Sequence, residues 1–200
     1  MVISLSLGFV GILIFLYLIW KRLKEDYSSE NIFSLAVFVL AGMLLGYLAS
    51  RFYFPKWWFW FEAFGAFLGF SYAVLKYNLR FFETFETVFI GLMPWLIIYY
   101  SNNLITCPTL VPILVTASVV VLLLLFWFID SRYKNFSWYK SGRIGLAGLV
   151  TAAFFFLTRA AIATFFPFMV SFVGKSEVIL SGVCAFTLFL LIYNLSKEEI

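Results

Sequence analysis

The sequence predicts an all-α integral membrane protein that forms a single domain. Of its 200 residues, 64% are hydrophobic and only 12% are charged, whereas soluble chains are about half apolar and a quarter charged. The mean hydropathy is +1.02. The apolar runs do not alternate with polar residues, as the strands of a membrane β-barrel do. These observations exclude a soluble globule and favour membrane-spanning helices.

Seven stretches of the chain are apolar enough to be transmembrane helices. A helix needs about 20 mostly apolar residues to cross a hydrocarbon core of about 30 Å. The sixth stretch contains Arg159 and a late proline, Pro167, so we expect its helix to end near that proline. The predicted spans are residues 3–20, 32–50, 57–75, 81–100, 109–129, 144–169 and 178–193.

The basic residues predict the orientation of these spans. Lysine and arginine number ten in the loops after the first, third and fifth spans and in the C-terminal tail, but only three in the alternate loops. Cytoplasmic loops carry the excess of such residues, which puts the N-terminus outside and the C-terminus in the cytoplasm. The first span lacks the basic start and the small-residue cleavage site of a secretory signal, so we expect it to be retained as an anchor.

Composition also limits the chemistry that this chain can perform. It contains no histidine, which excludes histidine-based acid–base catalysis and most zinc sites. The bases lie in short loops and form no single polar face, so nucleic acid is not an expected partner. Cys107 and Cys184 fall at different depths of the membrane, so we expect no disulfide between them. We expect no metal and no cofactor.

Four charged residues fall within apolar spans, where a charge costs between about 2.5 and more than 10 kcal/mol. Glu62 and Arg159 lie at similar depths, roughly 8 Å below the outer ends of their helices at about 1.5 Å per residue. Two hypotheses remain open: Arg159 holds the phosphate of a lipid headgroup, or it forms a structural ion pair with Glu62. Glu83 and Glu86 lie near the cytoplasmic boundary, where snorkelling or stabilisation of a helix start explains them.

Small residues and an aromatic basic segment complete the features of the predicted helices. Gly42 with Gly46, and Gly65 with Gly69, have the spacing that lets membrane helices approach closely, and packing is the default interpretation. The stretch 132–143 interleaves four bases with aromatic residues, which suits a segment on anionic headgroups or a simple topology signal.

Two glycine stretches resemble motifs of the prolipoprotein diacylglyceryl transferase family. Gly46-Tyr47 resembles the Gly-Tyr that ends the family's Gly-Gly-Arg-x-Gly-Tyr stretch, with Leu44 in place of the arginine. The run 64–69 is similar to the family's His-Gly-Gly-x-x-Gly, with Phe64 in place of the histidine. Together with seven spans in the same orientation, these stretches imply the fold of that family.

The sixth span carries the strongest part of this resemblance. Gly145 is followed fourteen residues later by Arg159, which matches the spacing from the family's glycine to its essential arginine. Ala163 stands where the family has a glutamate. After the fourth span, only residues 101–103, Ser-Asn-Asn, stand where the family has its Gly-Arg-x-Gly-Asn signature.

The resemblance implies a membrane-embedded enzyme of the bacterial cytoplasmic (inner) membrane. The family transfers diacylglycerol from phosphatidylglycerol to the thiol of a lipobox cysteine, so the implied partners are a phosphatidylglycerol-like phospholipid and prolipoprotein signal segments. Glu62 would accept the thiol proton and Arg159 would bind the phosphate. The further substrate-binding residues implied are Tyr47, Gly65, Gly69, Asn102 and Asn103.

Two other functions remain open because most of the family's catalytic residues are missing. The chain could be a non-catalytic homologue that binds lipid or serves as a membrane scaffold. It could also be a small transporter, which would need broken helices and an inverted repeat.

Overall fold

The protein is all-helical, as its sequence predicts. The computed structural model describes residues 2–106, 110–132, 145–167 and 171–197, with side chains over 7–102, 112–132, 145–167 and 171–197. The elements are α1 (Val2–Leu23), α2 (Ser29–Tyr53), the short 3₁₀ helix η1 (Pro55–Trp57), α3 (Trp58–Tyr77), α4 (Phe81–Thr106), α5 (Leu110–Arg132), α6 (Leu146–Phe165) and α7 (Lys175–Lys197).

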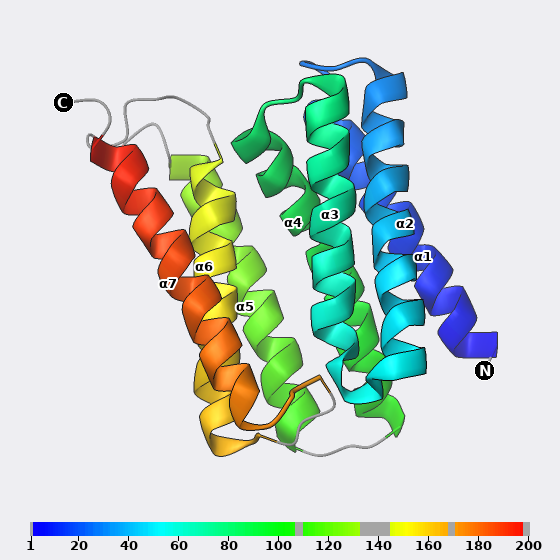
Figure 1. Cartoon of the computed structure of the whole chain (residues 1–200), viewed down its shortest axis with the longest axis vertical. Helices are drawn as coiled ribbons and strands as arrows, with labels where there is room; N and C mark the ends of the chain where they lie inside the picture. The colour runs from blue at the N-terminus through cyan, green and yellow to red at the C-terminus, as the bar shows by residue number, and fades with distance from the viewer. Residues whose placement is uncertain (1, 107–109, 133–144, 168–170, 198–200) are drawn as a thin grey trace.

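The helices form one bundle in which the chain reverses direction at each connection (Figure 1). Among the described residues, six helices, α2 to α7, are long and apolar enough to cross a membrane, so the chain is a multi-pass membrane protein. We call the end of the bundle at which α1 begins the N face, and the end at which α7 finishes the C face. Helices α1, α3, α5 and α7 all end at the C face (Figure 1).

Several helix ends follow the sequence closely. The α6 helix stops at Phe165, just before Pro167, as expected. Ser28 caps α2, because its hydroxyl accepts a hydrogen bond from the backbone N–H of Asn31 at 3.4 Å. The α4 helix continues through Pro94. The α7 helix is longer than its predicted span and therefore includes Glu177 in its first turn.

Helices α2 and α3 are in backbone contact along their length. A Cβ atom built on Gly42 would lie 2.1 Å from the carbonyl oxygen of Gly65, and one built on Gly65 would lie 2.1 Å from that of Gly42. A Cβ atom built on Gly46 or on Gly69 would likewise lie 2.2 or 2.1 Å from a backbone oxygen of the other helix. No other residue fits at such distances, so the two glycine pairs pack the helices, which was their default interpretation.

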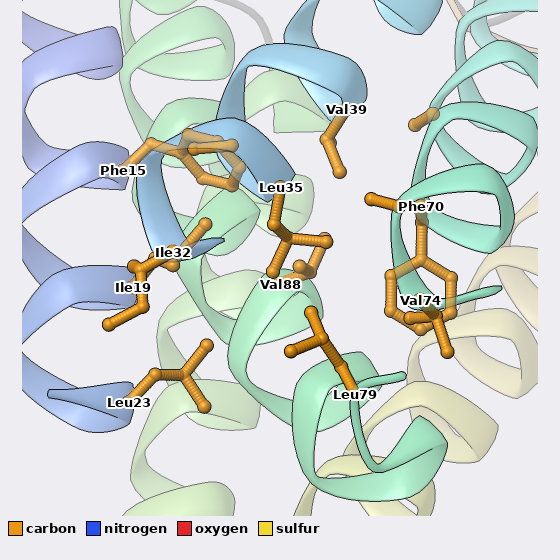
Figure 2. Packing of buried hydrophobic residues seen from close by; sticks show 13 residues of the cluster. Phe15, Ile19, Leu23, Ile32, Leu35, Val39, Phe70, Val74, Leu79 and Val88 are labelled. Carbon is orange, nitrogen blue, oxygen red and sulfur yellow. The ribbon is translucent and has the colours of Figure 1, made fainter. Parts of the chain in front are cut away.

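Two clusters of buried side chains share α4 as their common wall. The first joins α1, α2, α3 and α4 and includes Phe15, Leu35 and Phe70 (Figure 2). The second joins α3, α4, α5 and α6 and includes Phe59 and Phe155. Because lipid tails are as apolar as these side chains, close van der Waals packing holds the clusters together. The central helix therefore connects the two halves of the bundle.

Candidate functional site

The centre of the candidate site is an ion pair between two buried residues near the N face. Arg159 of α6 donates from Nε to Oε1 of Glu177 at 2.9 Å, and its Nη2 lies 2.8 Å from the same oxygen. Arg159 is 5% exposed and Glu177 is fully buried. Each charge neutralises the other inside the bundle, as an intramembrane charge requires.

The hypothesis that Arg159 pairs with Glu62 is therefore wrong. The first turn of α7 carries Glu177 onto α6, and that carboxylate takes the guanidinium. Glu62 lies on α3 where this helix crosses Gly46 of α2. Among the described residues, Glu62 makes no hydrogen bond or ion pair.

Two further donors complete the surroundings of Glu177. Trp60 of α3 donates from Nε1 to Oε2 at 2.8 Å, so α3 is tied to α7. Ser181, one turn further along α7, donates to Oε1 at 2.8 Å. Both carboxylate oxygens thus accept hydrogen bonds, which offsets the cost of removing the charge from water.

The guanidinium of Arg159 is engaged on all sides. Its Nη2 donates to the carbonyl oxygen of Ser171 at 3.0 Å. Its Nη1 reaches the hydroxyl of Ser171 at 3.4 Å and that of Tyr100 at 3.5 Å, and these two hydroxyls lie 3.0 Å apart. The Cζ atom lies 3.6 Å from the centroid of the Phe59 ring and 4.8 Å from that of Phe172, which are cation–π distances. No face of the guanidinium is left open for a second anion.

A small cavity adjoins Arg159 between α4, α5 and α6. Its volume is about 10 Å³. A single water molecule needs about 10–15 Å³ of such space, so the cavity has room for one water at most and none for a phosphate group. Its lining consists of Tyr100, Val115, Ser118, Val119, Phe155, Thr158, Arg159, Ile162 and Phe172.

Of the substrate-binding residues implied by the family resemblance, Tyr47, Gly65 and Gly69 are not among the described contacts of Arg159. Tyr47 is exposed, and its hydroxyl accepts a hydrogen bond from Arg51 Nη1 at 3.0 Å. Gly65 and Gly69 face the backbone of α2. Asn102 is half-buried near the end of α4. The side chain of Asn103, like Cys107 and residues 133–144, lies outside the described residues. The binding roles of these residues stay predictions.

A second polar cluster, of which only the Glu86 side chain is buried, lies near the C face. Arg22 of α1 forms an ion pair with Glu86 of α4, and its Nη2 also lies 2.9 Å from Oδ1 of Asp130 on α5. The other oxygen of Glu86 accepts a hydrogen bond from the backbone N–H of Gly148 at 2.8 Å. The Glu86 carboxylate therefore joins α4 to α1 and α6, and α5 enters the cluster through the contact of Asp130 with Arg22.

The sequence did not single out Glu177, Arg22 or Asp130. Glu177 directly precedes the predicted seventh span, and Arg22 and Asp130 fall just beyond the first and fifth, so all three look like boundary residues. One signal was present for Glu177, since Ser181 follows it by four residues and shares its helix face. Which carboxylate meets which arginine depends on helix packing.

Comparison with known proteins identifies no relative of this chain. No family model matches the chain, and neither a curated protein nor a solved structure matches it significantly. The geometry of the two polar clusters is therefore the basis for any functional conclusion.

Proposed function

We propose that this chain is a non-catalytic scaffold of the bacterial cytoplasmic membrane, a divergent relative of the diacylglyceryl transferases. The observation that supports the proposal is that the guanidinium of Arg159 already has hydrogen-bond partners within the protein. Its donors are taken up by Glu177, Ser171 and Tyr100, and the adjoining cavity has room for about one water molecule.

Diacylglyceryl transfer would require a cation for the leaving group and a base for the thiol. When the thiol attacks the lipid, the carbon–oxygen bond to the phosphate breaks, and the departing glycerol phosphate needs a cation aimed at its charge. The thiol proton needs a base within hydrogen-bond reach. Arg159 already neutralises Glu177, and Glu62 does not contact Arg159. The arrangement favours holding helices together over stabilising a leaving group.

Polar contacts at both faces support the role of a rigid scaffold. Near the N face, Glu177 and Arg159 join α6 and α7 to α3 through Trp60 and to α4 through Tyr100. Near the C face, Glu86 joins α4 to α1 and α6. The α2 helix is held by its glycine contacts with α3. Every helix thus has at least one specific link to another.

The proposed topology has seven spans with the N-terminus outside and the C-terminus in the cytoplasm. It rests on the charge asymmetry of the loops, together with the arrangement of the bundle, in which the N and C faces lie at opposite ends (Figure 1). Accessibility of single introduced cysteines to an impermeant thiol reagent in intact cells tests it. Labelling of position 78, between α3 and α4, from outside would contradict the proposed orientation.

A transfer assay tests the absence of catalysis. The purified chain is reconstituted in phosphatidylglycerol vesicles with a lipobox peptide, and the thioether product is measured by mass spectrometry. We expect no product above the level given by the Arg159→Ala variant, and no rescue of cells depleted of their own transferase. Product formation that depends on Arg159 would overturn the proposal.

Diacylglyceryl transfer is the second candidate function, and one feature favours it. The longest hydrogen bonds of Arg159 are those of Nη1, at 3.4 and 3.5 Å. Arg159 also lines the small cavity. On its other side the guanidinium is covered by the Phe59 ring of α3, whose centroid lies 3.6 Å from Cζ, so a phosphate approaching from there would have to displace α3 from α6 and α7.

Distance measurements separate the two candidates. Spin labels at Phe64→Cys on α3 and Ile179→Cys on α7, both exposed positions, report the spacing of these helices in a chain carrying Cys107→Ser and Cys184→Ser. A scaffold gives the same narrow distance distribution in phosphatidylcholine and phosphatidylglycerol bilayers. A longer distance only in phosphatidylglycerol supports a site that opens for lipid.

A further inference from the structure

Five exposed cations at the C face each lie over an aromatic ring one helical turn earlier in the chain. The distances from the charged group to the ring centroid range from 4.4 to 5.8 Å. We call these five cations the cation belt. The pairs are Tyr17–Lys21, Trp20–Lys24, Tyr72–Lys76, Phe128–Arg132 and Tyr193–Lys197.

The pairs recur because four helices end at the same face. Helices α1, α3, α5 and α7 each carry at least one pair in or next to the last turn (Figure 1). Lys24 follows the end of α1, but its N–H still bonds the carbonyl oxygen of Trp20 at 3.0 Å, so the turn is helical. Lys76 lies near two additional rings, those of Phe38 and Tyr77, at 5.3 and 5.4 Å.

This geometry sets the depth of the charges. Side chains of a helix tilt toward its N-terminus, so a cation at the fourth position folds back over the ring and toward the membrane. Four of the rings, those of Tyr17, Tyr72, Phe128 and Tyr193, are themselves exposed on the lipid-facing perimeter. Aromatic rings at helix ends sit at the level of the headgroups. The five charges are therefore held at the depth of lipid phosphates.

The carboxylates that the structure describes do not pair with the cation belt. The ion pairs of this face involve Arg22, with Glu86 and Asp130, and Arg80, with Glu83. In the described part of the chain, none of the five belt cations forms an ion pair with a carboxylate. The remaining acidic side chains described at this face lie in or beside the connection between α1 and α2, and they are Glu25, Asp26 and Glu30.

The N face lacks this arrangement. Its arginine, Arg51, donates a hydrogen bond to the hydroxyl of Tyr47. Lys56 and Lys175 lie over no ring of the described residues. The two ends of the bundle therefore differ in how their cations are placed as well as in how many they have.

We propose that the cation belt binds the phosphate groups of anionic phospholipids, which gather around the C face of the bundle. Five positive charges at phosphate depth, which pair with no carboxylate of the described residues, match a headgroup of net negative charge. Each base near an anionic surface contributes to such attraction, and salt weakens it within a Debye length. This inference is independent of whether the bundle catalyses anything.

Lipid selectivity of the full chain in bilayers tests the proposal. The chain is reconstituted in phosphatidylcholine that contains a trace of spin-labelled phosphatidylglycerol or, separately, spin-labelled phosphatidylcholine with the same acyl chains. Electron paramagnetic resonance then gives the fraction of each probe that is immobilised at the protein. We expect a preference of roughly twofold or more for phosphatidylglycerol at low salt, falling toward equality at about 1 M salt.

Two matched variants test whether the preference for phosphatidylglycerol comes from the cation belt. Replacing the belt with glutamine (Lys21→Gln, Lys24→Gln, Lys76→Gln, Arg132→Gln, Lys197→Gln) should lower it clearly, whereas Arg51→Gln, Lys56→Gln and Lys175→Gln at the N face should leave it in place. Equal association of both probes with the unaltered chain at low salt would overturn the proposal, even if the belt variant failed to fold. An undiminished preference in the folded belt variant would overturn it too.

Discussion

Glu86, a residue of α4, caps the N-terminus of a different helix, α6. Its carboxylate accepts the backbone N–H of Gly148, in the first turn of α6, at 2.8 Å. The N-cap residue of α6, Gly145, offers no side chain for this purpose. A carboxylate at this point also interacts favourably with the helix dipole. The proposed stabilisation of a helix start by Glu86 therefore applies to α6, whereas the sequence suggested its own helix.

Gly148→Ala should destabilise the protein because Glu86 occupies the space of the new methyl group. A Cβ at this position would lie 2.6 Å from the Cα of Glu86, so the two helices must separate. We expect a loss of about 1–3 kcal/mol in the free energy of unfolding, measured by denaturant titration in detergent micelles. Gly182→Ala is the control, since no atom lies within 4 Å of its Cβ position. Equal stability of the two variants would contradict the observed approach of Glu86 to α6.

Arg159→Ala should be strongly destabilising because it leaves Glu177 buried without its cation. Breaking a buried pair in this way costs about 3–5 kcal/mol. Arg51→Ala, at an exposed position of the same face, should change stability by only about 0.5 kcal/mol.

A double-mutant cycle isolates the pair itself. Arg159→Met combined with Glu177→Leu should cost clearly less than the sum of the two single changes, because neither charge is then left unpaired. Additive losses in the folded double variant would mean that the two residues act independently.

Trp60→Phe should weaken the link between α3 and α7 while keeping an aromatic ring against Phe156. The indole N–H is lost from Oε2 of Glu177, and a hydrogen bond to a buried charged group is worth about 1–3 kcal/mol. Unfolding followed by circular dichroism measures the change. Trp127→Phe, at a site 70% exposed, should have almost no effect. A similar small effect at Trp60 would show that its hydrogen bond contributes little.

Gly42→Ala should disrupt the contact between α2 and α3, since its Cβ would lie 2.1 Å from the carbonyl oxygen of Gly65. The helices must move apart, and we expect a loss of about 1–3 kcal/mol or misfolding. Gly8→Ala in α1, with no atom within 4 Å, should be neutral or gain up to about 1 kcal/mol of helix propensity. Protease resistance in micelles ranks the variants, and unchanged resistance for Gly42→Ala would be the contrary result.

Local sequence accounts for the helices and for the close packing of α2 and α3. The ends of α2 and α6 follow from Ser28 and Pro167, because capping and the missing proline N–H act within a few residues. The glycine spacing of Gly42 and Gly46 likewise indicates a close helix contact, and two consecutive antiparallel helices are its nearest partners.

The sequence by itself determined that this chain is apolar, helical and multi-pass, and that Arg159, inside an apolar span, needs an anionic partner. Only the tertiary structure decided which partners the buried charges have. Arg159 meets Glu177 rather than Glu62, and Glu86 meets Arg22 and Gly148. The physical reason is that hydropathy and capping are properties of neighbouring residues, whereas the partner of a buried charge is set by how helices far apart in the chain rotate and cross.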